Sequence, residues 1–221
     1  MKLITTLFVI LLSISSLFSQ NRKDSLLVFV GELIEIKSLP QKSIVERIDT
    51  IIEGKDTIYH QIETLRSDNG YAAKYKILQM VYGSYQYDTI NFTAFDHYGN
   101  PDFATFKTVL LFVSYHKGKL YHEKYQYFDL YKTTDGKWAS PGDPYKFDNY
   151  HRKDIKAQAL LFPKTVFYDL NNYENDKIQE IFQKEHFTIV GQKAFPKTGT
   201  YIDDLFKVKK EGVLKARGIF E

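Results

Sequence analysis

The chain of 221 residues contains no cysteine, one tryptophan and six prolines. The absence of cysteine excludes disulfide bonds and thiol nucleophiles, so packing alone has to hold the fold together. Chains of this size bury about 70% of the surface that the unfolded polypeptide exposes, which makes this feasible. The formal net charge of +3 is small and evenly spread, whereas nucleic-acid-binding proteins usually carry a concentrated basic face. We therefore expect no nucleic-acid partner.

Long apolar runs are also missing, because no segment after the N-terminus reaches the roughly 20 apolar residues that a membrane-spanning helix needs. The N-terminus has the order of a secretory signal peptide, with Lys2, an apolar stretch from Leu3 to Leu17, and Ser19 before a polar segment. We predict a signal peptide over residues 1–19 and cleavage near Ser19. The product would be exported, periplasmic or extracellular, with no transmembrane segment after cleavage.

Aromatic residues are abundant, at 16% of the chain, with 17 Tyr and 17 Phe. They favour β-strands and also supply contact surface at binding sites. The clearest strand is "TINFTAF", where Ile90, Phe92 and Ala94 share one face and polar residues the other. Residues 106–115 contain the apolar run Val109 to Val113, which predicts a central strand covered on both faces.

Residues 20–221 are predicted to form a single β-rich domain. Its other strands are inferred from alternation and from glycines at bends and strand ends: a strand bent at Gly31, a hairpin around Gly54, a strand over Ala72–Tyr82 and a long strand over Leu120–Lys132. The C-terminal segment, about residues 171–212, is predicted to be helical. One helix follows Asn172 and carries Ile178, Ile181 and Phe182 at helical spacing, and a second opens with a capping box at Thr200 and stops at Gly212. The predicted fold class is mainly β (α+β): an antiparallel β-barrel or strongly curved sheet, OB-like, with a short helical C-terminal part packed on it.

The segments "VFVGELIEIK", "YKILQMVYG" and "YDTINF" follow one another as a glycine-bent strand, a strand that ends in glycine and an alternating strand. Over residues 28–95 this order resembles the start of the five-stranded OB barrel in netrin-like and TIMP-like secreted modules. The resemblance implies a fold only. The cysteines that staple the animal members, including the one with which inhibitors bind metal, are absent here, so no inhibitory residue is carried over.

The stretch "FDHYGNPDF" contains two carboxylates, an imidazole and an amide around a turn signal. It supports the hypothesis of a hydrolase or metal-dependent enzyme centred on Asp96, His97 and Asp102. Because neighbouring strand residues point to opposite faces, His97 with Asp102 is the pair to examine. The structural alternative is an Asx-type turn, in which Asp96 or Asn100 bonds to the loop backbone and Pro101 fixes φ.

Histidine could also provide a metal site, with His97, His116 and His122 as candidate ligands. The predicted turn at Lys117-Gly118 places His122 opposite about Val113 and leaves His116 at the turn. A three-histidine site would therefore require His97 to lie between them. We predict no cofactor and no confident metal site.

The favoured function is that of a non-catalytic binding or interaction module. No nucleophile elbow, P-loop or dinucleotide-binding glycine motif is present. Aromatic side chains gather beside a predicted loop over residues 139–151, and their flat faces suit a sugar or a peptide. The predicted binding residues are Tyr121, Tyr125, Tyr127, Trp138, Tyr145 and Tyr150, for an unknown protein, peptide or glycan ligand.

Overall fold

The computed structural model describes residues 25–40, 44–53, 56–64, 68–146 and 154–221. The predicted signal peptide and the turn at Gly54 lie outside the described residues. No helix in the described part of the chain is long and apolar enough to cross a membrane.

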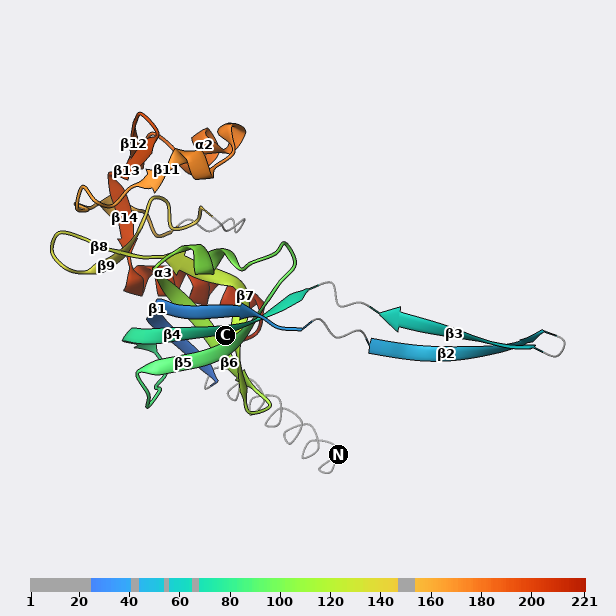
Figure 1. Ribbon diagram of the computed structural model, residues 1–221. Helices are drawn as coiled ribbons and strands as arrows, with labels where there is room; N and C mark the ends of the chain where they lie inside the picture. The colour runs from blue at the N-terminus through green and yellow to red at the C-terminus, as the bar shows by residue number, and fades with distance from the viewer. Residues whose placement is uncertain (1–24, 41–43, 54–55, 65–67, 147–153) are drawn as a thin grey trace, which may run out of the picture.

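Five strands close into a barrel in the order β1-β4-β5-β7-β6 (Figure 1). They are β1 (Leu26–Ser38), β4 (Asn69–Tyr82), β5 (Thr89–Asp96), β6 (Thr108–His116) and β7 (Lys119–Asp129). The strands pair antiparallel except β5 and β7, which run parallel where Thr93 meets Tyr121. A 3-10 turn, η1 (Asp102–Thr105), connects β5 to β6. A mainly β protein with a closed, OB-like five-stranded barrel is therefore confirmed.

The barrel has two apolar faces. The alternating residues of all five strands fill its interior around Phe29, Tyr75 and Val109. The outward residues of β1 and β6, such as Val28 and Phe112, form a second cluster beneath the C-terminal helix. The predicted double coverage of the central strand β6 is confirmed, because residues 108–113 are all buried.

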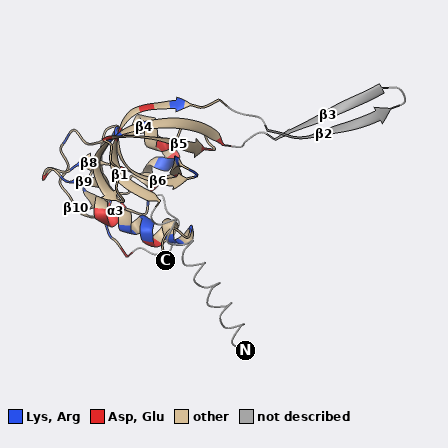
Figure 2. Cartoon of the chain, turned by 90° about the horizontal axis from the view of Figure 1, so that it is seen from below, with Lys and Arg blue, Asp and Glu red and all other residues tan. Residues whose placement is uncertain are grey.

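The C-terminal helix α3 (Ile202–Lys209) continues into a π-helical turn, η3 (Lys210–Leu214). Its acidic first turn and basic last turn, visible in Figure 2, both suit the helix dipole. The predicted capping box is wrong, because Tyr201 is the N-cap and Thr200 is buried within the preceding strand. Gly212 leaves helical geometry at φ −98° and ψ −109°, and the kink there separates two helices, which agrees with the predicted stop.

The two helices expected within residues 171–212 are present as α2 (Asn175–Ile181) and α3, but three short strands that were not expected lie between them. The segment holds η2 (Leu170–Asn172), α2, β12 (Phe187–Val190), β13 (Lys193–Pro196) and β14 (Thr198–Tyr201) before α3. Gly191 turns the chain with a φ of 57°, which returns β13 against β12. These strands pair with β8 (Tyr131–Lys132), β9 (Trp138–Pro141), β10 (Gln158–Ala159) and β11 (Tyr168–Asp169) in two small sheets.

The predicted hairpin is formed by β2 (Ile44–Glu53) and β3 (Asp56–Thr64). It belongs to a two-stranded sheet of its own, inserted between the barrel strands β1 and β4.

Candidate functional site

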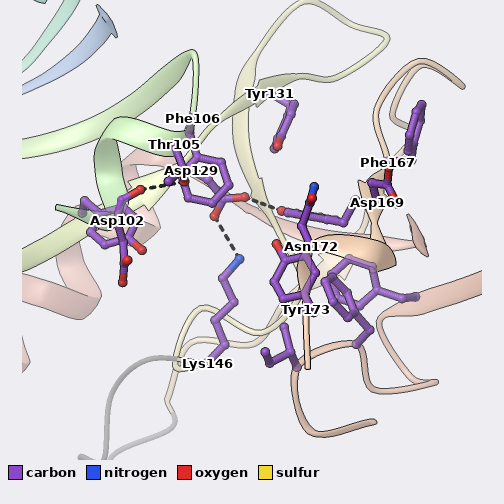
Figure 3. A pocket seen from close by; sticks show the side chains of 15 residues that line it. Asp102, Thr105, Phe106, Asp129, Tyr131, Lys146, Phe167, Asp169, Asn172 and Tyr173 are labelled. Atoms are coloured by element: carbon purple, nitrogen blue, oxygen red, sulfur yellow. Dashed lines mark hydrogen bonds and ion pairs between the residues drawn. The ribbon is translucent and has the colours of Figure 1, made fainter. Parts of the chain in front are cut away.

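A pocket of about 680 Å³ lies between the barrel and the small C-terminal sheet of β11, β12 and β13 (Figure 3). Its volume is within the range of about 300–1,000 Å³ typical of small-molecule sites. Fifteen residues line it, of which eight are aromatic: Phe106, Tyr127, Tyr131, Phe167, Tyr168, Tyr173, Phe182 and Phe187. The barrel contributes η1 and the end of β7, and the C-terminal region contributes β11, η2 and α2.

The aromatic wall on the C-terminal side is a packed cluster around Phe182. The Phe182 ring centroid lies 4.9 Å from that of Tyr173 and 5.2 Å from those of Tyr168 and Phe187. These tilted and edge-to-face arrangements are the ones that aromatic rings prefer. The wall is therefore held in shape by its own packing before any ligand enters.

A buried carboxylate, Asp129 at the end of β7, forms the floor of the pocket. Its Oδ1 accepts hydrogen bonds from Lys146 Nζ at 3.0 Å and Ser140 Oγ at 3.3 Å, and its Oδ2 accepts one from the Tyr168 hydroxyl. The Asp129 side chain is 1% exposed and that of Lys146 is 12% exposed. Lys146 also donates to the Pro141 carbonyl at 3.1 Å. Burial of charge is tolerated here because both ions are paired and hydrogen-bonded.

The tyrosines around this carboxylate are kept in their neutral form. Burial is the main cause and the charge of Asp129 the second. Together they raise the pKa of Tyr131 and Tyr173, and they raise the pKa of Tyr168 well above its ordinary value. For Tyr127, burial and then Asp102 and Asp129 raise the pKa. Neutral phenols are hydrogen-bonding groups and not bases, so this ring of hydroxyls suits recognition.

Of the three residues in the enzyme hypothesis, only Asp102 lines this pocket. Asp96 is buried and its Oδ1 accepts from the Tyr98 backbone N–H at 2.8 Å, which confirms the Asx-type turn. The His97 side chain is 49% exposed, and its Nδ1 lies 3.6 Å from Asp68 Oδ1. The structure thus brings Asp96 and Asp102 together in the lining of a cavity of only about 10 Å³, whereas His97 does not line that cavity.

The three candidate metal ligands are not brought together either. His122 is opposite Val113, as predicted, and its Nε2 donates to the Gln126 carbonyl at 2.8 Å. Its ring lies 4.5 Å from that of Phe103, and burial lowers its pKa to about 4. His116 pairs with Lys119 beside the hairpin turn. In the described part of the chain, no group of three or more His, Cys, Asp or Glu side chains is arranged to hold a metal ion.

The predicted aromatic surface is divided among several places. Tyr127 lines the main pocket, whereas Tyr121 lies 6.2 Å from Phe95 in a separate hollow of about 560 Å³. Trp138 and Tyr145 pack against the cluster beneath α3. Tyr125, at φ 65°, is exposed, and Tyr150 lies outside the described residues.

The cause of this division is a large bulge in β7. Leu111 of β6 pairs with Tyr127 while Val113 pairs with His122, so two steps along β6 face five along β7. The regular alternation expected over Leu120–Lys132 does not survive the bulge.

Sequence reasoning missed Asp129, Lys146, Tyr168 and Tyr173. One signal was present, because Asp129 is a charged residue within the aromatic run "YQYFDLY", where a buried position demands a partner. The partners themselves, Lys146 and Tyr168, are too distant in sequence to be recognised from spacing.

Comparison of the chain with protein-family models, curated proteins and solved structures found no match. The resemblance to netrin-like and TIMP-like modules stays a prediction.

Proposed function

We propose that this protein is an exported, non-catalytic binding module whose ligand enters the pocket above Asp129. The observation that carries the proposal is a pocket of about 680 Å³ with eight aromatic side chains in its wall and a fully hydrogen-bonded ion pair in its floor. A packed aromatic wall with a few fixed polar groups is the usual construction of a ligand site. The ligand classes that suit it are a glycan or a peptide.

Binding is favoured over catalysis because the polar groups of the floor already have partners within the protein. Both oxygens of Asp129 accept hydrogen bonds, and Lys146 donates to Asp129 and to Pro141. A general base needs a lone pair directed at its substrate, and a nucleophile needs such a base beside it. Asp129 and Lys146 are bonded to each other and to the protein, so they hold the shape of the site and have no lone pair directed at a substrate.

The proposal is tested by filling the pocket. Asn172 lines the pocket and is exposed, so Asn172→Trp places an indole in the cavity at little cost to folding. Gln179→Trp, at an exposed position of α2 outside the lining, is the matched control. We expect calorimetric titration with a panel of oligosaccharides and short peptides to give binding that Asn172→Trp abolishes and Gln179→Trp retains. Binding that survives Asn172→Trp, or no binding by any member of the panel, would contradict the proposal.

A further inference from the structure

The charges that line the pocket do not balance. Asp102, Asp129 and Asp169 oppose a single cation, Lys146, which is already paired with Asp129. In the described part of the chain, neither Asp102 nor Asp169 forms an ion pair. Asp169 Oδ1 accepts from the Asn171 backbone and side chain, which are neutral donors. The residues that line the pocket therefore carry a net negative charge, within a chain whose formal net charge is +3. The nearby cation Lys193 lies outside the lining, over the ring of Phe167.

Asp102 in particular lacks a compensating charge. Burial, and next the nearby charge of Asp96, raises the pKa of the Asp102 carboxyl. Both causes act against its ionised form, and a positive charge placed beside it would act in the opposite direction.

The aromatic wall of the pocket also suits a positively charged ligand, because the face of an aromatic ring is negative and attracts cations. The outer ring of the pocket, Phe167, already has Lys193 Nζ over it at 4.1 Å from the centroid. The rings of Tyr127, Tyr131 and Tyr173 also line the cavity.

Building on the proposed function, we infer that the pocket binds an organic cation: an ammonium or guanidinium group on an apolar body, held by Asp102, Asp169 and the aromatic wall. The cation comes either from a free small amine or from the basic side chain of a peptide. A glycan without a positive charge would use the aromatic faces and leave the two carboxylates unpaired.

Two pairs of probes matched in shape test this inference. Choline and 3,3-dimethylbutan-1-ol represent the free amine and its neutral counterpart. N-acetyl-arginine methylamide and N-acetyl-citrulline methylamide represent the peptide side chain and its neutral counterpart. We expect at least one cation to bind about tenfold more tightly than its neutral counterpart in calorimetric titrations. The pair with the larger preference identifies the source.

Variants then assign the preference to the two carboxylates. Asp102→Asn combined with Asp169→Asn keeps the size of both side chains, and asparagine retains the ability to cap η2. We expect this double variant to remove most of the tenfold preference and to leave the affinity for the neutral probes unchanged. Asp88→Asn, which removes an equal charge from an exposed position outside the lining, should change neither affinity.

Equal binding of a cation and its neutral counterpart, or a preference that survives in the double variant, would overturn the inference. In that case the proposed function would still stand if the neutral probes or the saccharides bind and Asn172→Trp abolishes their binding. The inference would also be overturned if none of the four probes binds. In that case the separate panel of oligosaccharides and peptides would decide the proposed function.

Discussion

Two regions of this protein combine carboxylates with aromatic rings, and they use them differently. In the loop from Phe95 to Asn100, Asp96 bonds to the backbone two residues on, and only the next carboxylate along the chain, Asp102, reaches the pocket. In the pocket above Asp129, side chains from the barrel and from the C-terminal sheet converge on one cavity. Local clustering has produced a turn, whereas convergence across elements has produced a cavity that can hold a ligand.

The largest effect on stability is expected from removing Asp129, the floor of the pocket. Asp129→Ala leaves Lys146 and Tyr168 buried without their shared partner. Breaking a buried ion pair from one side costs about 3–5 kcal/mol, so we expect the free energy of unfolding to fall by that amount in urea titrations. A loss below about 1 kcal/mol would show that the ion pair is not part of the framework.

The loop region, more than the pocket, should lose stability at acidic pH, because the buried His122 packs against Phe103 beneath the loop. Its pKa is about 4 in the folded protein and 6.5 as a model value for the unfolded chain. Between these values the unfolded chain binds more protons, so stability falls as the pH falls from 6.5 towards 4. We expect this residue to account for about 3 kcal/mol of the loss.

His122→Gln provides the reference for that titration, since glutamine does not titrate. The difference in unfolding free energy between pH 7 and pH 4 should be smaller in the variant by most of this amount. Parallel pH curves for the two proteins would contradict the assignment.

The turn in the loop should contribute less. Asp96→Ala removes the hydrogen bond to Tyr98 and should cost about 1 kcal/mol, measured by denaturant unfolding. Asp96→Asn keeps an acceptor for an Asx-type turn and should stay within about 0.5 kcal/mol of the parent. If both substitutions cost the same, the charge of Asp96 and not the turn is what matters.

The smallest expected effect lies beside the pocket floor, at Thr200, which pairs with Ser140 across β14 and β9. Thr200 Oγ1 is buried and has no hydrogen-bond partner among the described residues. Thr200→Val should therefore raise the melting temperature slightly, by a few degrees at most, because an unpaired buried hydroxyl is destabilising. A clear loss of stability would show that the Thr200 hydroxyl is stabilising and would contradict this expectation.

The barrel was accessible from sequence because its strands are long, β5 alternates cleanly and β6 is a continuous apolar run. The bend at Gly31 was predictable as well, since β1 shifts register between Val30 and Gly31 and a Cβ there would meet Phe29 at 2.9 Å. The strands β12 to β14 were not predictable. They are four residues each, which is too short for an alternating pattern to be recognised, and β14 depends on β9, a partner distant in the chain. The helical spacing of apolar residues did predict α2 and α3.

For the pocket, Asp102 and Tyr127 were among the predicted site residues, but each for another reason. Asp102 was selected as part of an acid-base pair, and Tyr127 as part of a continuous aromatic strand face. The bulge in β7 moved Tyr127 to the pocket, and the C-terminal sheet supplied Tyr168. Such convergence depends on tertiary packing, which local sequence patterns do not encode.

The most direct test of the difference between the two regions is a map of amide chemical shifts during titration with the tightest-binding probe. If the pocket is the binding site, the largest changes fall within residues 127–131 and 168–173, while His97 to Asn100 change little. The largest changes at His97 to Asn100, with the pocket unaffected, would show that the loop is the binding site after all.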